Sequence, residues 1–256
     1  MVLRDLAIEE IIGEGGFSVV YKAEHIVLDE VRAIKKLEPI FADEVNEIKA
    51  LRRFAREAKI LTELNHKNIV RVYDSGIAGG HPYIIMDLVE GKDLEKWIRE
   101  KGFFDEQTGL KIIEQILDAI SAAHRSGVVH RDIKPQNIMW NGSRAIILDF
   151  GAGHWLEHQI STRITTSPIG TYGYIANELF DDPSLLRKNF DCYSIGVLFH
   201  YILTGHIPSA GSPRHYLSEN NIQEKIIEFI LRALSPPDIR FEDGERMLDS
   251  LRSIEH

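Results

Sequence analysis

The chain has 256 residues, of which 44% are apolar and 27% charged, and a formal net charge of −9, which fits one large domain or two closely packed lobes. The acidic balance argues against a general nucleic-acid-binding protein, and the single cysteine, Cys192, excludes an intrachain disulfide framework and a zinc site made of several cysteines. No apolar run is long enough to span a bilayer and the N-terminus has no secretory signal pattern, so we expect a cytoplasmic protein without a membrane segment.

The first third of the chain predicts a small lobe of five strands and one helix. Short alternating or β-branched runs, separated by glycine or acidic loops, predict strands at 6–12, 18–23, 31–36, 70–75 and 83–88. Apolar residues at helical spacing predict a helix over 45–64.

A glycine-rich loop joins the first two predicted strands. Glycines let backbone amides approach phosphates closely, and the strand-loop-strand context favours a flap over a nucleotide. A plain hairpin turn is the alternative, since such a loop is a weak signal by itself. The residues predicted to contact the nucleotide here are Gly13, Glu14, Gly15, Gly16, Phe17, Ser18 and Val20.

Lys35 lies on the third predicted strand, two residues after Ala33. A lysine on the inner face of a sheet needs an anion, and Glu57, in the middle of the predicted helix, is its natural partner. Together they would fix the ammonium group against the α and β phosphates, with Ala33 also at the nucleotide. A solvent-facing Lys35, and a surface pair of Glu57 with Arg53, remain alternatives.

The chain after residue 91 predicts mainly helices. They are expected at 94–100, 105–126, 190–203, 221–234 and 241–254, with short strands at 128–129, 138–140 and 145–148. The helix over 190–203 is strongly apolar, so Cys192 within it is expected to be a buried core residue.

The segment between the two parts predicts a hinge that binds a base. Met86, Asp87 and Val89 end a strand there, and the extended backbone at Asp87 and Val89 offers C=O and N–H groups to an adenine edge. Asp93 is a candidate acceptor for ribose hydroxyls, although capping the following helix is a serious rival role. Met139 completes the predicted nucleotide contacts.

The most informative stretch is His-Arg-Asp-Ile-Lys-Pro-Gln-Asn at 130–137, followed twelve residues later by Asp-Phe-Gly at 149–151. Asp132 can accept the proton of an attacking hydroxyl, and Lys134 can reach the phosphoryl group being transferred. Asn137 and Asp149 offer the hard oxygen ligands that Mg²⁺ prefers. The order and spacing of these residues make the signal strong.

These motifs together resemble the eukaryotic-type protein kinase family over almost the whole chain, and most closely its bacterial serine/threonine members. The resemblance implies an α+β bilobal fold, with a β-rich N-lobe at about 1–86, a hinge at about 87–91 and a helical C-lobe at about 92–256. It also implies that the γ-phosphoryl group of ATP, with Mg²⁺ or Mn²⁺, is transferred to a serine or threonine hydroxyl of a protein substrate.

The resemblance implies further roles. Lys134 fits the serine/threonine branch, and Thr171 matches the Thr that contacts the catalytic Asp and Lys. Asp191 matches the Asp that tethers the backbone of the catalytic loop. Arg240 matches the Arg that pairs with the glutamate of Ala-Pro-Glu, which here is Glu178.

The chain departs from the family pattern at three places. Ser18 replaces the third glycine of the flap, and Asn177 replaces the proline of Ala-Pro-Glu. The connection at 207–220 is short, which puts the usual surface for docking a substrate protein in doubt.

Arg131 matches an Arg that pairs with a phosphorylated residue of the activation segment. Thr165, Thr166 and Ser167 are the expected sites of autophosphorylation, with Ser161 and Thr162 as further candidates. A polar loop without a regulatory role is the alternative. Family members often activate by pairing, so a homodimer is a further expected partner.

Two other functions remain open. A pseudokinase would keep the fold without turnover, but it typically lacks at least one catalytic residue, and the complete set is present here. A small-molecule kinase generally lacks an activation segment like the one that contains Thr171 and Glu178.

Overall fold

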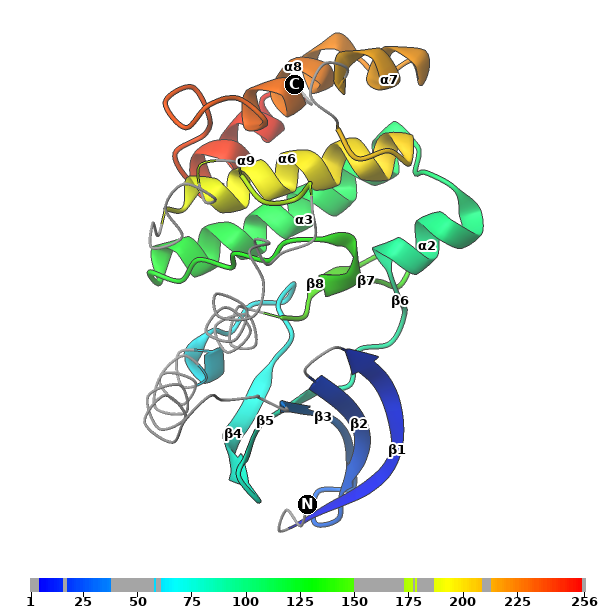
Figure 1. Ribbon diagram of the computed structural model, residues 1–256, viewed down its shortest axis with the longest axis vertical. Coiled ribbons are helices and arrows are strands. Elements are labelled where there is room, and N and C mark those ends of the chain that lie inside the picture. Colours follow the sequence, from blue (N-terminus) through cyan, green and yellow to red (C-terminus); the bar gives the residue numbers. More distant parts are fainter. Residues whose placement is uncertain are drawn as a thin grey trace. The chain divides into compact units, whose positions relative to one another are not determined.

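The computed structural model describes residues 5–15, 18–37, 58, 61–149, 173–176, 178, 187–208 and 213–254. The chain divides into two compact units (Figure 1). The first contains the chain up to Val89 together with Asp149, and the second contains Glu90–Leu148 and the described residues from Gly173 onward. Within the described residues, no helix has the length and apolar character needed to cross a membrane.

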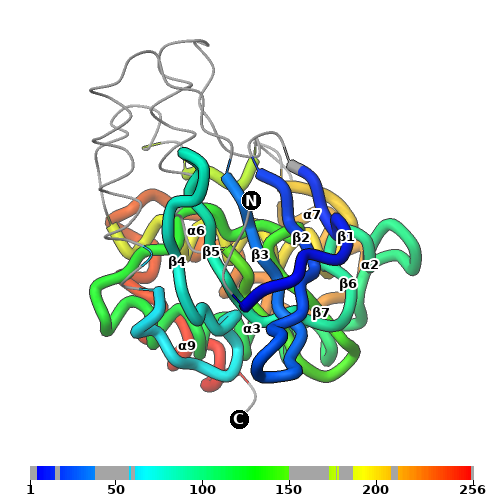
Figure 2. The backbone as a smooth tube through the Cα atoms, turned by 90° about the horizontal axis from the view of Figure 1, so that it is seen from below, coloured from blue at the N-terminus to red at the C-terminus, as the bar shows by residue number. Residues whose placement is uncertain are grey.

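The first unit is built on one antiparallel sheet, whose strands run side by side in Figure 2 in the order β1-β2-β3-β5-β4. All five predicted strands are present, with ends shifted by at most three residues. Their bounds are β1 (Leu6–Gly15), β2 (Ser18–His25), β3 (Glu30–Leu37), β4 (Val72–Ala78) and β5 (His81–Asp87).

The two faces of this sheet differ in chemistry. Ala23, Ile34 and Ile85 form a buried apolar cluster on one face. Ala33 and Lys35 alternate with Ile34 along β3, so they belong to the opposite face. Of the predicted helix over 45–64, only Ala58 and residues 61–64 are described; Ala58 and 61–63 are helical, and Leu64 lies beyond the helix end.

The second unit combines a small sheet with helices. Its strands, in the order β6-β7-β8, are β6 (Lys92–Asp93), β7 (Ile138–Trp140) and β8 (Ala145–Ile147), and a 3-10 turn, η1 (Pro135–Asn137), precedes β7. The helices are α2 (Leu94–Lys101), α3 (Glu106–Arg125), α6 (Asn189–Thr204), α7 (Pro213–Glu219), α8 (Glu224–Ala233) and α9 (Gly244–Arg252). Helix α3 packs against α6 and α9.

Helix α6 is the buried centre of the second unit, because almost all of its residues are buried, apolar and polar ones alike. Gly196 lets it approach α8 closely, since a Cβ at this position would lie 2.6 Å from the Cβ of Ala233. Cys192 is fully buried, as predicted, and burial raises the pKa of its thiol.

Three elements differ from the sequence prediction. Residues 128–129 form no strand: the amide of Val128 donates to the carbonyl of Ala123 at 2.9 Å, so it completes the end of α3. The connection at 207–220 contains helix α7, which was not predicted because it is short and polar. Strand β6 was also missed, because two residues show no sequence periodicity.

Candidate active site

The catalytic loop brings Asp132, Lys134 and Asn137 together. Lys134 Nζ lies 2.7 Å from Asp132 Oδ2, and Asn137 Nδ2 donates to the same oxygen at 2.9 Å and to the Asp132 carbonyl at 2.8 Å. Ile133 and Pro135, which alternate with these residues along the chain, are buried. The side chains of Asp132 and Lys134 are about one-fifth exposed. A carboxylate held by a cation and an amide is fixed in position and remains reachable.

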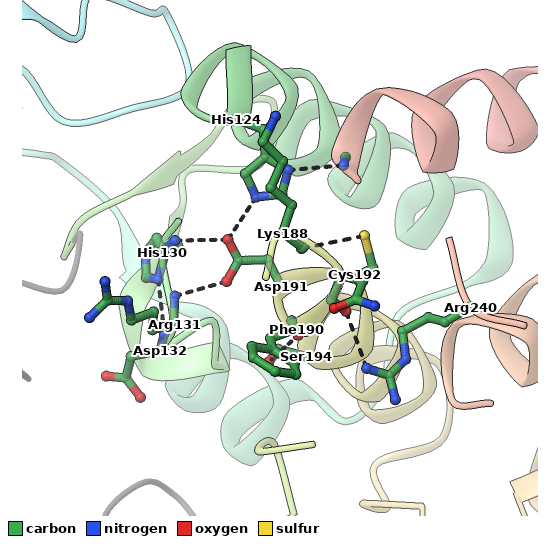
Figure 3. Close-up of polar contacts among 12 residues, drawn as sticks. His124, His130, Arg131, Asp132, Lys188, Phe190, Asp191, Cys192, Ser194 and Arg240 are labelled. Carbon is green, nitrogen blue, oxygen red and sulfur yellow. Dashed lines mark hydrogen bonds and ion pairs between the residues drawn. The ribbon is translucent and has the colours of Figure 1, made fainter. Parts of the chain in front are cut away.

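Asp191 of α6 anchors the loop. In Figure 3 its carboxylate points toward the backbone of the loop, where Oδ2 accepts from the amide of His130 at 2.7 Å and Oδ1 from that of Arg131 at 2.8 Å. The predicted tether is therefore confirmed. Both amides therefore have a carboxylate oxygen as partner.

His124 completes the anchor, and sequence reasoning missed it. Its Nε2 lies 2.9 Å from Asp191 Oδ2, and its Nδ1 accepts from the amide of Gly244 at 3.0 Å. Because Nδ1 is the acceptor, the proton is assigned to Nε2, which donates to Asp191. A histidine in the last turn of a helix that precedes the catalytic loop was the available signal.

The charge of Asp191 is held by its partners. Burial acts to raise the pKa of this fully buried carboxyl, but hydrogen bonding to His124, the nearby His130 and the backbone amide of His130 outweigh it. Its pKa therefore lies below the ordinary value. The anchor is a carboxylate at neutral pH.

Arg131 adopts an unusual backbone conformation between these contacts. Its φ of 69° lies in the left-handed region, which is uncommon for a residue with a side chain. The two amides gripped by Asp191 impose this turn. The phosphorylated partner expected for Arg131 falls among residues outside those described.

Lys35 pairs with Asp149 in the first unit. Its Nζ lies 2.7 Å from Asp149 Oδ2, and the lysine side chain is only 13% exposed. Lys35 therefore has an anionic partner, which argues against the alternative of a solvent-facing lysine. Glu57, its predicted partner, and Arg53 lie outside the described residues.

Val20, Ala33, Lys35 and Met86, four of the predicted nucleotide contacts in the first unit, share one face of its sheet. Val20 lies opposite Lys35, and Ala33 lies opposite Met86, two residues along β3. Residues two apart on a strand point to the same side. Gly13, Glu14 and Gly15 end β1 and Ser18 begins β2, while Gly16 and Phe17 between them lie outside the described residues.

At the predicted hinge, the rival role of Asp93 is confirmed. Its carboxylate accepts from the amide of Lys96 at 2.8 Å and so caps α2. A contact with ribose stays a prediction. Met139 lies opposite Asp93 in the pair β6-β7. The amide of Asp87 donates to the carbonyl of Arg71 at 3.0 Å, which secures the end of β5.

The two predicted Mg²⁺ ligands belong to different units, Asn137 to the second and Asp149 to the first. Asn137 uses its Nδ2 on Asp132, so its Oδ1 is the atom left to bind a cation. Amide and carboxylate oxygens are the ligands that Mg²⁺ prefers. Among the described residues, no group of three or more His, Cys, Asp or Glu could hold a metal ion.

Glu178 and Arg240 form the predicted ion pair. Arg240 Nη1 lies 2.6 Å from Glu178 Oε1, and the arginine side chain is 2% exposed. Its Nε also donates to the carbonyl of Ser235 at 3.0 Å. The pair therefore forms even though Asn177 takes the place of the proline in the family's Ala-Pro-Glu motif. The predicted phosphorylation sites and Thr171 lie outside the described residues.

The fold and the arrangement around Asp132 define a protein kinase domain, and comparison with known proteins agrees. The chain belongs to the family described as "Protein kinase domain", which it matches over residues 6–252.

The chain is 36% identical over 253 residues to the serine/threonine-protein kinase PrkC of Bacillus subtilis, covering 93% of this chain and 38% of PrkC. It is 33% identical to PknB of Mycobacterium leprae, covering 94% of this chain and 38% of PknB. The chain thus spans well under half the length of these relatives.

Solved structures confirm the α+β kinase fold. Rad53 1-466 in complex with AMP-PNP is 28% identical, with a TM-score of 0.78 over 96% of this chain and 65% of that chain. The apo form of PpkA-294 is 23% identical, with a TM-score of 0.80 over 98% of this chain and 97% of that chain.

Proposed function

We propose that this chain is catalytically active and transfers the γ-phosphoryl group of MgATP to a serine or threonine hydroxyl of a protein substrate. The observation that carries the proposal is the grip of Lys134 and Asn137 on one oxygen of Asp132. A pseudokinase has no need of this arrangement.

The kinase domain extends over 1–256, with its N-lobe at about 1–86, hinge at about 87–91 and C-lobe at about 92–256.

Asp132 orients the attacking hydroxyl and receives its proton. The ammonium group of Lys134 and the side-chain amide of Asn137 both contact Oδ2 of Asp132. Oδ1 is therefore the oxygen assigned to the substrate hydroxyl. Lys134 then supplies positive charge to the transferred phosphoryl group. Because phosphoryl-transfer transition states are loose, positioning and charge stabilisation account for most of the catalysis.

Lys35 and the metal ligands hold the phosphates. Lys35 approaches the α and β phosphates with Glu57 as its partner, while Asn137 and Asp149 bind Mg²⁺, or Mn²⁺ in its place. The bound cation would neutralise the charge on the phosphate oxygens. The contact of Lys35 with Asp149 supports this, because it brings a phosphate-binding cation beside a metal-binding carboxylate.

Regulation by autophosphorylation is the remaining part of the proposal. Phosphate on Thr165, Thr166 or Ser167 would add about −1.5 to −2 charge for Arg131 to bind, and Thr171 would contact Asp132 and Lys134. A homodimer would bring two such segments together in the cytoplasm, where ATP is supplied. Phosphate mapping by mass spectrometry that finds none of these three residues modified in active protein would contradict this part.

The activity is tested by incubating the 256-residue chain with γ-labelled ATP and Mg²⁺, alone and with a generic basic protein. Asp132→Asn is the matched control, since it removes the charge and conserves the size. We expect label on the chain or the acceptor, reduced by at least a hundredfold in the variant with little change in ATP affinity. Equal labelling by both proteins would contradict the assignment of Asp132.

A further inference from the structure

Tyr73 stands at an irregularity in the sheet of the first unit. Val72 lies opposite Met86 and Asp74 opposite Ile85, so Tyr73 is an extra residue on β4 with no partner of its own on β5. Such bulges redirect a side chain and often lie beside functional sites. Here the Tyr73 hydroxyl donates to Asp87 Oδ1 at 2.7 Å.

Two arginines hold the ring of Tyr73 in this position. The guanidinium carbon of Arg32 lies 3.9 Å from the ring centroid, and that of Arg71 lies 5.0 Å from it. Arg32 is only 8% exposed, and on β3 it lies opposite Asp87. A guanidinium group stacked on an aromatic face is attracted to it, more strongly when it is withdrawn from water. Although Tyr73 is 38% exposed, these two contacts favour the position of its ring beside Asp87.

Asp87 is consequently held at two points. Tyr73 binds its carboxylate, and the carbonyl of Arg71 accepts from its amide at 3.0 Å. Burial first, and then the hydrogen bond to Asp87, raise the pKa of Tyr73, so the phenol remains a donor at neutral pH. Asp87 is the last residue of β5, where the sheet meets the hinge.

We propose that Tyr73 is a positioning residue for the nucleotide: with Arg32 behind its ring, it fixes the side chain of Asp87 and thereby the strand end that meets the adenine edge. The inference rests on the proposed function, which assigns backbone groups of Asp87 and Val89 to adenine. Neither Tyr73 nor Arg32 is assigned a contact with the base. They restrict the backbone that does, so less order has to be imposed on binding.

The test compares Tyr73→Phe with Tyr83→Phe in the 256-residue chain. Tyr73→Phe removes the hydroxyl and keeps the ring between the arginines. Tyr83 belongs to the neighbouring strand β5 of the same sheet, and its phenol is not part of the contact with Asp87. The measurements are Kd for adenosine and for MgATP, KM and kcat with the generic basic protein, and thermal unfolding.

For Tyr73→Phe we expect Kd for adenosine and KM for ATP to rise by about two- to tenfold, the range given by one hydrogen bond, with kcat unchanged. Tyr83→Phe should match the wild type. Lys35→Met provides a contrast, because it should weaken the binding of MgATP and leave the binding of adenosine, which has no phosphate, unchanged. Arg32→Met should raise the Kd for adenosine, as Tyr73→Phe does.

Three results would overturn the inference. A lower unfolding temperature for Tyr73→Phe with unchanged adenosine Kd would make the contact merely structural. Equal losses of affinity in the Tyr73 and Tyr83 variants would indicate a general effect of removing a hydroxyl from this sheet. Wild-type protein that binds neither adenosine nor MgATP would overturn the proposed function, and this inference with it.

Discussion

Asp191→Asn replaces one oxygen of a fully buried carboxylate by an NH₂ group at nearly constant volume. The carboxylate accepts from His124 and His130 through Oδ2 and from Arg131 through Oδ1. The single oxygen of asparagine cannot serve both sides, so its NH₂ group must face at least one N–H donor. Losing a charge-assisted hydrogen bond costs about 1.5–3 kcal/mol, and a buried donor without a partner costs about 1–3 kcal/mol.

We therefore expect Asp191→Asn to lower the free energy of unfolding by about 3–5 kcal/mol, and the unfolding temperature by roughly 10 °C for a domain of this size. The value of kcat should fall as well, because the backbone that carries Asp132 loses its anchor. Circular dichroism during heating and steady-state kinetics measure the two effects.

The pH dependence follows from the depressed pKa of Asp191. Burial opposes this depression, but the hydrogen bonds from His124 and the loop prevail. The stabilisation is therefore fully present above the unfolded-state pKa of about 3.9 and is lost as the pH falls through the lower folded-state pKa. The difference in free energy of unfolding between the wild type and Asp191→Asn should stay constant from about pH 5 upward and shrink below about pH 4.

Asp105→Asn is the matched control, because Asp105 is an exposed helix cap and asparagine caps helices equally well. Its unfolding temperature should remain within about 2 °C of the wild type. If Asp191→Asn behaved like this control, or kept the full kcat, the reasoning that the carboxylate fixes the catalytic loop would be refuted.

Three further substitutions test other contacts. Glu178→Gln leaves the buried Arg240 without a charged partner and should cost about 1–3 kcal/mol in thermal unfolding; an unchanged unfolding temperature would contradict the importance of this pair. Asp93→Ala should cost about 1 kcal/mol through the lost cap and raise the Kd for adenosine in calorimetry through loss of the predicted ribose contact, whereas an unchanged Kd would leave Asp93 with the capping role alone. Lys35→Met should retain the wild-type circular dichroism spectrum but lose turnover by orders of magnitude, and full turnover would show that Lys35 does not bind the phosphates.

The sequence predicted the parts of the fold that local patterns determine. The five strands of the first sheet and helix α3 follow from alternation and helical spacing, and their ends differ by only a few residues. The expected strand at 128–129 was wrong because the amide of Val128 donates to the carbonyl of Ala123 and so completes the end of α3. The tether of the catalytic loop, Asp191, lies about sixty residues away in the sequence and was expected from the resemblance to the kinase family, not from a local pattern.

Site residues in the catalytic motif were predictable because their spacing is fixed by the chemistry. Asp132, Lys134 and Asn137 lie within six residues and meet at one oxygen. His124 and Tyr73 were not predictable in the same way. Each acts through a contact whose geometry depends on the fold: a histidine tautomer set by Gly244 in one case, and a bulge in β4 in the other.

The burial of Cys192 has a practical consequence for spectroscopy. Thiol reagents react with exposed thiolates, whereas the thiol of Cys192 is fully buried and burial raises its pKa. Since it is the only cysteine in the chain, the native protein offers these reagents almost no background. A cysteine introduced at an exposed position, for example Gln136→Cys in the catalytic loop, can therefore carry a fluorophore or spin label without removal of the natural residue.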